Sequence, residues 1–106
     1  MTDMKNARAV AERLQAIAEP TRLQIIRALT QGSKNVTELA KLLNVEIVNV
    51  SHHLGVLRQA RLVTDEKHGR FVVYKLNEEV FSTSSTWVLV MDLGWCTVNF
   101  KPDAGA

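Results

Sequence analysis

The chain has 106 residues, enough for one small domain, and its hydrophobic and charged fractions of 46% and 23% are ordinary for a globular protein. Its single cysteine, Cys96, excludes a disulfide within the chain, and no apolar run reaches the roughly 18 residues that span a membrane. We therefore expect a soluble, cytoplasmic protein. Residues 1–76 hold 12 Lys and Arg against 7 Asp and Glu, whereas residues 77–106 hold 1 against 4. The basic body is compatible with a polyanionic partner.

Apolar residues recur at helical spacing over residues 4–18, which predicts a first helix. This helix could pack against its own core or against a second subunit. Because a chain this short often completes its core by oligomerising, we expect the second subunit. Pro20 starts the next helix, since proline is tolerated in a first turn, where its missing N–H would have no partner. This second helix is expected to run to about Thr30 and to end at Gly32.

The third and fourth helices are predicted from the residues that start them. Asn35, followed three residues later by Glu38, resembles a capping box and opens the third helix. Residues 44–45 form a turn, and Glu46 opens the fourth helix, which is expected to run to about Ala60. Two helices joined by so short a turn form a helix-turn-helix, in which the second helix is the recognition helix.

One face of the fourth helix is apolar. Val50, Leu54 and Leu57 lie at positions i, i+4 and i+7, so the helix is expected to pack by this face and to offer the other to a groove. His53 shares this face, and we expect it to pack beneath the helix or to bond to backbone. The leading turn of the helix contains Ile47 and Val48, which are apolar residues.

Residues that favour β structure follow, at 62–64 and 71–74, on either side of Lys67-His68-Gly69-Arg70. Gly69 is the expected turn residue, so the two runs form a hairpin. Helices in this order followed by a hairpin make a winged helix-turn-helix. The predicted fold class is mainly α with a small β-hairpin, in the α+β class.

The last part of the chain has a different composition. Residues 87–100 are rich in aromatic and β-branched side chains with Gly94 in the middle, which favours one added strand, or two, bent at that glycine, in place of a last helix. A helix would fit only in the short stretch 78–85. An exposed apolar strand invites aggregation, so we expect this one to be paired at a dimer interface. We assign residues 1–80 to a winged helix-turn-helix DNA-binding domain and residues 81–106 to a strand-like extension involved in dimerisation.

Several motifs, in this order and at this spacing, resemble the ArsR/SmtB family of small bacterial repressors, and the resemblance covers about residues 5–77. The motifs are Glu19-Pro20-Thr21-Arg22-Leu23, Thr37-Glu38-Leu39-Ala40, Val50-Ser51-His52-His53-Leu54, Val56-Leu57-Arg58 and Leu62-Val63. The resemblance implies a homodimeric winged-helix repressor that binds a palindromic double-stranded DNA operator and releases it on sensing a metal or another signal. The alternative is a winged-helix module that binds another protein through Ile47 and Val48. We find no arrangement of residues that suggests an enzyme.

The recognition position of the fourth helix and the basic hairpin tip supply the candidate DNA-binding residues. Asn can bond adenine bidentately, Ser and His can bond base edges or phosphate, and a wing tip meets phosphate or the minor groove. The alternative for each is a solvated surface, and for Thr37 a local capping role in place of a phosphate contact. The candidates are Thr37, Asn49, Ser51, His52, Arg58, Lys67, His68 and Arg70.

The usual metal ligands of the family are absent. Metal-sensing relatives carry a Cys-x-Cys box at the third helix or His, Asp and Glu ligands on a C-terminal helix, whereas residues 35–40 hold no cysteine and the tail holds no histidine. We predict no cofactor and no metal site within one chain. The alternative is a metal site shared across a dimer. The residues do not identify an inducer. Cys96 is a candidate thiol sensor, but its only local cation is Lys101, which favours a buried, inert cysteine.

One further departure from the family concerns Arg61, where relatives usually have glycine. A left-handed conformation at this helix end costs more for Arg than for Gly.

Overall fold

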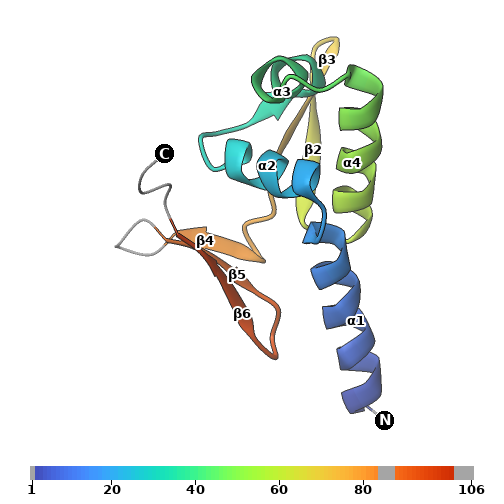
Figure 1. Cartoon of the computed structure of the whole chain (residues 1–106), viewed down its shortest axis with the longest axis vertical. Coiled ribbons are helices and arrows are strands. Elements are labelled where there is room, and N and C mark those ends of the chain that lie inside the picture. The colour runs from blue at the N-terminus through green and yellow to red at the C-terminus, as the bar shows by residue number, and fades with distance from the viewer. Residues whose placement is uncertain (1, 84–87, 102–106) are drawn as a thin grey trace.

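The computed structural model describes residues 2–83 and 88–101, which form four helices and two small antiparallel sheets (Figure 1). This α+β arrangement confirms the predicted fold class. The elements, in chain order, are α1 (Thr2–Ile17), α2 (Pro20–Leu29), β1 (Lys34–Asn35), α3 (Val36–Leu43), α4 (Ile47–Gln59), β2 (Val63–His68), β3 (Phe71–Leu76), β4 (Phe81–Thr83), β5 (Leu89–Asp92) and β6 (Thr97–Phe100).

The helix starts follow from local hydrogen bonds. Pro20 occupies the first turn of α2, and Glu19 caps that helix by accepting a bond from the Arg22 N–H at 2.9 Å. At α3 the predicted capping box is present: the Asn35 side chain accepts from the Glu38 N–H, and the Glu38 carboxylate accepts from the Asn35 N–H, both at 2.8 Å. The predicted starts of these two helices are confirmed.

Helices α2, α3 and α4 enclose the main core. Val50, Leu54 and Leu57 of α4 are fully buried, which confirms the predicted packing face of the recognition helix. They meet the apolar sides of the other helices and the start of the hairpin. The remaining fully buried side chains of this layer are Ile25, Ile26, Leu39, Leu62 and Val63.

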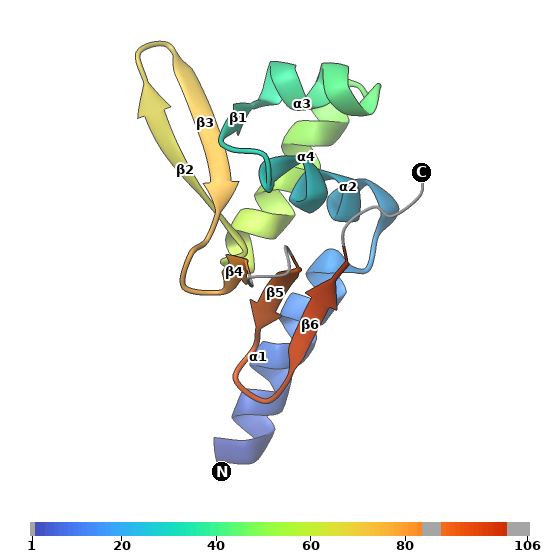
Figure 2. The same cartoon turned by 90° about the vertical axis from the view of Figure 1, so that its left-hand side faces the viewer.

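The hairpin of β2 and β3 forms a wing that stands away from the helices (Figure 2). Gly69 lies in its turn with φ of +63°, a conformation in the left-handed region, as predicted for this residue. The short strand β1 was not predicted. It pairs antiparallel with β3, Lys34 opposite Tyr74, and gives a sheet of order β1-β3-β2.

The tail forms a second sheet of order β4-β5-β6, with Gly94 in the turn between β5 and β6 at φ of +88°. Two strands bent at Gly94 are therefore confirmed. The helix considered for residues 78–85 is wrong, because Phe81–Thr83 is a strand. Strand β5 pairs on both sides within its own chain, because β4 and β6 flank it, while a role of this segment in dimerisation stays a prediction. Trp87, included in the predicted segment, lies outside the described residues.

The tail sheet is attached to the core by its buried side chains. Phe81, Leu89, Met91 and Leu93 belong to the same hydrophobic cluster as the helices. Helix α1, in contrast, extends beyond the rest of the molecule towards the N-terminus (Figures 1 and 2). Among the described residues, no helix has both the length and the apolar character needed to cross a bilayer.

Candidate nucleic-acid interface

The outer face of α4 carries the three predicted readers. Asn49, Ser51 and His52 are exposed outside the buried Val50–Leu54–Leu57 face: His52 lies opposite that face, whereas Asn49 and Ser51 lie on its two flanks, each about 100° of helix rotation from Val50. Within the described part of the chain, the side chains of Asn49 and Ser51 make no hydrogen bond, so their polar groups are available to a ligand. The His52 ring lies 5.2 Å from the ring of His53, centroid to centroid.

The tip of the wing lies at the same end of the molecule as the leading turn of α4, opposite the N-terminal end of α1 (Figures 1 and 2). Lys67, His68 and Arg70 are exposed around Gly69. His68 is paired with Glu66, its Nε2 lying 2.6 Å from Oε1. This hydrogen bond and the charge of His68 hold the pKa of the Glu66 carboxyl below its ordinary value of 4.5. The free cationic surface of the tip therefore rests on Lys67 and Arg70.

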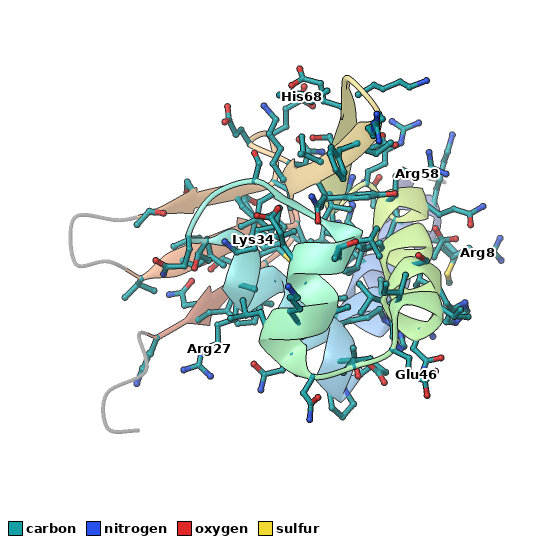
Figure 3. All side chains as sticks on the ribbon, turned by 90° about the horizontal axis from the view of Figure 1, so that it is seen from above. Arg8, Arg27, Lys34, Glu46, Arg58 and His68 are labelled. Carbon is teal, nitrogen blue, oxygen red and sulfur yellow. The ribbon has the colours of Figure 1, made fainter. Side chains whose placement is uncertain are left out.

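Arg58 lies at the far end of α4, nine residues or about 14 Å along the helix from Asn49. Its Nη1 is 3.5 Å from Oδ2 of Asp65 in β2, where Figure 3 shows the arginine between α4 and the wing. Both side chains are exposed, so the pair stabilises the fold by only about 0–1 kcal/mol. The structure thus places Arg58 apart from the leading turn, towards the side of the wing.

Thr37 is exposed in the first turn of α3. Its local capping role, the alternative to a phosphate contact, is wrong, because Asn35 and Glu38 make the capping bonds. The Thr37 hydroxyl is therefore left at a helix N-terminus, where partial positive charge favours an anion.

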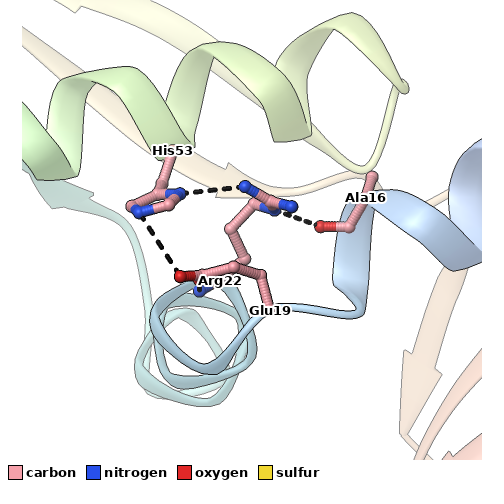
Figure 4. Close-up of polar contacts among 4 residues, drawn as sticks. All are labelled: Ala16, Glu19, Arg22 and His53. Atoms are coloured by element: carbon pink, nitrogen blue, oxygen red, sulfur yellow. Dashed lines mark hydrogen bonds and ion pairs between the residues drawn. The ribbon is translucent and has the colours of Figure 1, made fainter.

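A polar cluster that sequence reasoning missed lies beneath α4 (Figure 4). His53 is half-buried, and its Nδ1 is 3.0 Å from Nη1 of Arg22. A guanidinium only donates, so Nδ1 accepts, and the ring proton of the neutral imidazole is on Nε2. Arg22 also donates from Nε to the carbonyl oxygen of Ala16 at the end of α1. Of the two expectations for His53, packing beneath the helix is confirmed, whereas a bond to backbone is not seen: its hydrogen-bond partner is the side chain of Arg22 in α2.

Glu19 completes this cluster. Its Oε2 is 3.7 Å from Nε2 of His53. Burial raises the pKa of the Glu19 carboxyl, but the hydrogen bonds from the Arg22 and Thr21 N–H groups and attraction to the Arg22 guanidinium, and to His53 whenever its ring is protonated, outweigh burial, so the pKa is lower than its ordinary 4.5. The Glu-Pro-Thr-Arg and His-His motifs contain the residues of this cluster. Sequence reasoning did not connect them, because Arg22 and His53 are 31 positions apart in the chain.

Cys96 is exposed, so the expectation of a buried cysteine is wrong. It lies at the end of the turn between β5 and β6, where its carbonyl oxygen accepts a hydrogen bond from the Leu93 N–H at 2.9 Å. In this turn the Cys96 side chain is directed to the surface. Among the described residues, no group of three or more His, Cys, Asp and Glu side chains is arranged to hold a metal ion.

Residues 19–65 match the family described as "Bacterial regulatory protein, arsR family". The chain is 36% identical over 75 residues to the transcriptional repressor SdpR of Bacillus subtilis (strain 168), which covers 71% of this chain and 83% of SdpR. It is 45% identical over 74 residues to the HTH-type transcriptional regulator NmtR of Mycobacterium tuberculosis (strain ATCC 25618 / H37Rv), covering 70% of this chain but only 62% of NmtR.

Among solved structures, a homodimeric winged helix-turn-helix DNA-binding domain from Mycobacterium bovis, determined in solution, has a similar fold. Its TM-score is 0.70 and its sequence identity 27%, and the match covers 73% of this chain and 71% of that domain. These relatives are regulators of transcription, in agreement with the prediction that the chain is not an enzyme.

Proposed function

The chain belongs to the arsR family of bacterial regulatory proteins, and from this premise we propose that it is a homodimeric repressor that binds a palindromic operator in the cytoplasm. One observation carries the proposal: α4 buries a single apolar face, while its polar side and the basic wing tip lie at the same end of the molecule. In a winged helix-turn-helix protein this end meets the duplex, with the recognition helix in the major groove.

The proposed contacts divide into base readout and phosphate binding. Asn49, Ser51 and His52 face the base edges from α4. Thr37 offers its hydroxyl and the N-terminus of α3 to a phosphate. The wing and the end of α4 supply the other contacts to the DNA backbone. Among these residues, His68 is expected to bind most weakly, because it is already paired with Glu66. The residues proposed to contact the DNA backbone here are Arg58, Lys67, His68 and Arg70.

Homodimerisation is proposed to use α1. Met4 is 63% exposed and Leu14 38%, so this helix presents apolar side chains that its own chain leaves uncovered. The similar domain from Mycobacterium bovis is homodimeric. The tail sheet, as a strand-like extension in residues 81–106, is proposed to add to the same interface. A monomer in sedimentation at micromolar concentration would contradict this part of the proposal.

The proposal is tested by mobility shift with duplex DNA from the promoter region of the chain's own gene. We expect binding that weakens steeply with salt, because phosphate contacts dominate affinity. The double change Ser51→Ala and His52→Ala should abolish specific binding, whereas Ser33→Ala, at an exposed serine between α2 and β1, should leave it intact. Specific binding that survives the double change would show that these two residues are not the readers.

A second candidate function is binding of another protein through the leading turn of α4. The exposure of Ile47, at 51%, and of Val48, at 76%, favours it, since such side chains suit an apolar partner. The two functions differ in the mobility shift. A folded dimer that shifts no duplex at low salt would favour the protein-binding module.

A further inference from the structure

The leading turn of α4 has an apolar surface that the fold does not use. Ile47 and Val48 are exposed, and neither belongs to the core cluster or to the partly buried side chains packed against it. The neighbouring Val45 does pack there. The two exposed side chains therefore gain little from folding, and their apolar area is free to be covered by a ligand.

The charges around this turn select the kind of ligand. Glu46 precedes it and is exposed, and its side chain makes no capping bond (Figure 3). A carboxylate repels phosphate, and no Lys or Arg lies between residues 46 and 57. The turn is thus unsuited to the DNA backbone, whereas the wing tip, with Lys67 and Arg70, is suited to it. This distribution places the leading turn over the bases.

The floor of the major groove offers one apolar group, the C5 methyl of thymine. We propose that Ile47 and Val48 read thymine methyl groups, so that the operator half-site carries A·T base pairs under the leading turn of α4. Asn49 follows directly and matches the same base pairs, because an amide can bond N6 and N7 of adenine bidentately. This inference rests on the proposed function and specifies its ligand.

The test starts from duplexes selected out of a random-sequence pool by the full-length chain. Each thymine of the selected half-site is then replaced singly by uracil, which removes the methyl group and keeps every hydrogen-bonding atom. We expect one or two of these replacements to weaken binding by about three- to tenfold, the effect of one buried methyl group. Equal binding at every position would overturn the inference while leaving DNA binding established.

Protein variants assign the effect to these two side chains. In Val48→Ser and Ile47→Ser, the uracil penalty at the matching position should disappear, since no apolar contact remains to be lost. Leu42→Ser is the matched control. Leu42 is 61% exposed and lines a groove with Pro20 and Gln24 of α2, outside the recognition helix, so its variant should keep the full penalty.

The outcomes separate the inference from the proposed function. A penalty that persists in both α4 variants would mean that another residue reads the methyl, and would overturn the inference. A folded dimer that selects no duplex would overturn the proposed function itself and leave the apolar turn to a protein partner. Because the uracil comparison uses the unaltered protein, equal binding at every position overturns the inference even where a variant folds poorly.

Discussion

Replacement of Arg22 should loosen the attachment of the recognition helix. This side chain donates to the carbonyl of Ala16 at the end of α1 and to Nδ1 of His53 in α4, so it joins two helices to α2 (Figure 4). Hydrogen bonds from a charged donor contribute about 1.5–3 kcal/mol each. Arg22→Ala loses both, and because the site is only half-buried we take the lower end for each. The expected loss in free energy of unfolding is about 3 kcal/mol.

The bond to His53 is isolated by a double-mutant cycle. Arg22→Ala, His53→Ala and the double variant should show a coupling of about 1–1.5 kcal/mol, because the second change removes a bond that the first has already broken. Arg22→Lys keeps the charge but lacks the planar fork, so it should retain at most one of the two bonds. Urea unfolding, followed by circular dichroism at one fixed protein concentration, measures each value, since the stability of a dimer depends on concentration.

The matched control is Arg70→Ala, at an exposed arginine of the wing tip, which should change the stability by no more than about 0.5 kcal/mol. If Arg22→Ala behaved like this control, or if the coupling with His53 were below about 0.5 kcal/mol, the cluster would not hold α4 in place.

Three further changes test local features of the fold. Asn35→Ala should lower the free energy of unfolding by about 1 kcal/mol, because it removes half of the capping box; an unchanged urea midpoint would contradict this. Arg61→Gly should raise the free energy of unfolding by about 0.5–1 kcal/mol, because Arg61 has φ of +62°, a left-handed conformation that glycine adopts without strain. A lower urea midpoint would show that contacts of the arginine side chain outweigh this strain. The pKa of Glu19 is lowered in the folded protein, so its carboxylate stabilises the fold above pH 4.5, and this contribution to the free energy of unfolding is lost as the pH falls further. Glu19→Gln should therefore make the free energy of unfolding depend less on pH between pH 5 and pH 3. Parallel pH profiles for the variant and the unaltered protein would refute this.

The features that the sequence predicted correctly depend on neighbours along the chain. Pro20 and the Asn35–Glu38 pair act within one helical turn, so the starts of α2 and α3 could be located from residue types alone. Gly69 and Gly94 likewise mark turns because their own backbones take positive φ. The fold class followed from these local signals and from the spacing of the buried residues of α4.

The features that were missed depend on contacts between distant segments. Strand β1 has only two residues, Lys34 and Asn35, and exists because Val73 and Tyr74 lie opposite them. Strand β4 similarly depends on β5, and residues 81–83 alone carry little β signal. Burial of Cys96 was inferred from its apolar neighbours, but the turn after Gly94 directs this residue to the surface.

The polar cluster beneath α4 connects two parts of the proposed function. Arg22 bonds to the last turn of α1, which is proposed to form the dimer, and to His53 of α4, which is proposed to enter the major groove. In a two-fold dimer the separation of the two recognition helices has to match one turn of the duplex. In the proposed dimer the angle between α1 and α4 would set that separation, so we expect Arg22 to contribute to operator recognition by holding the two helices at a fixed angle.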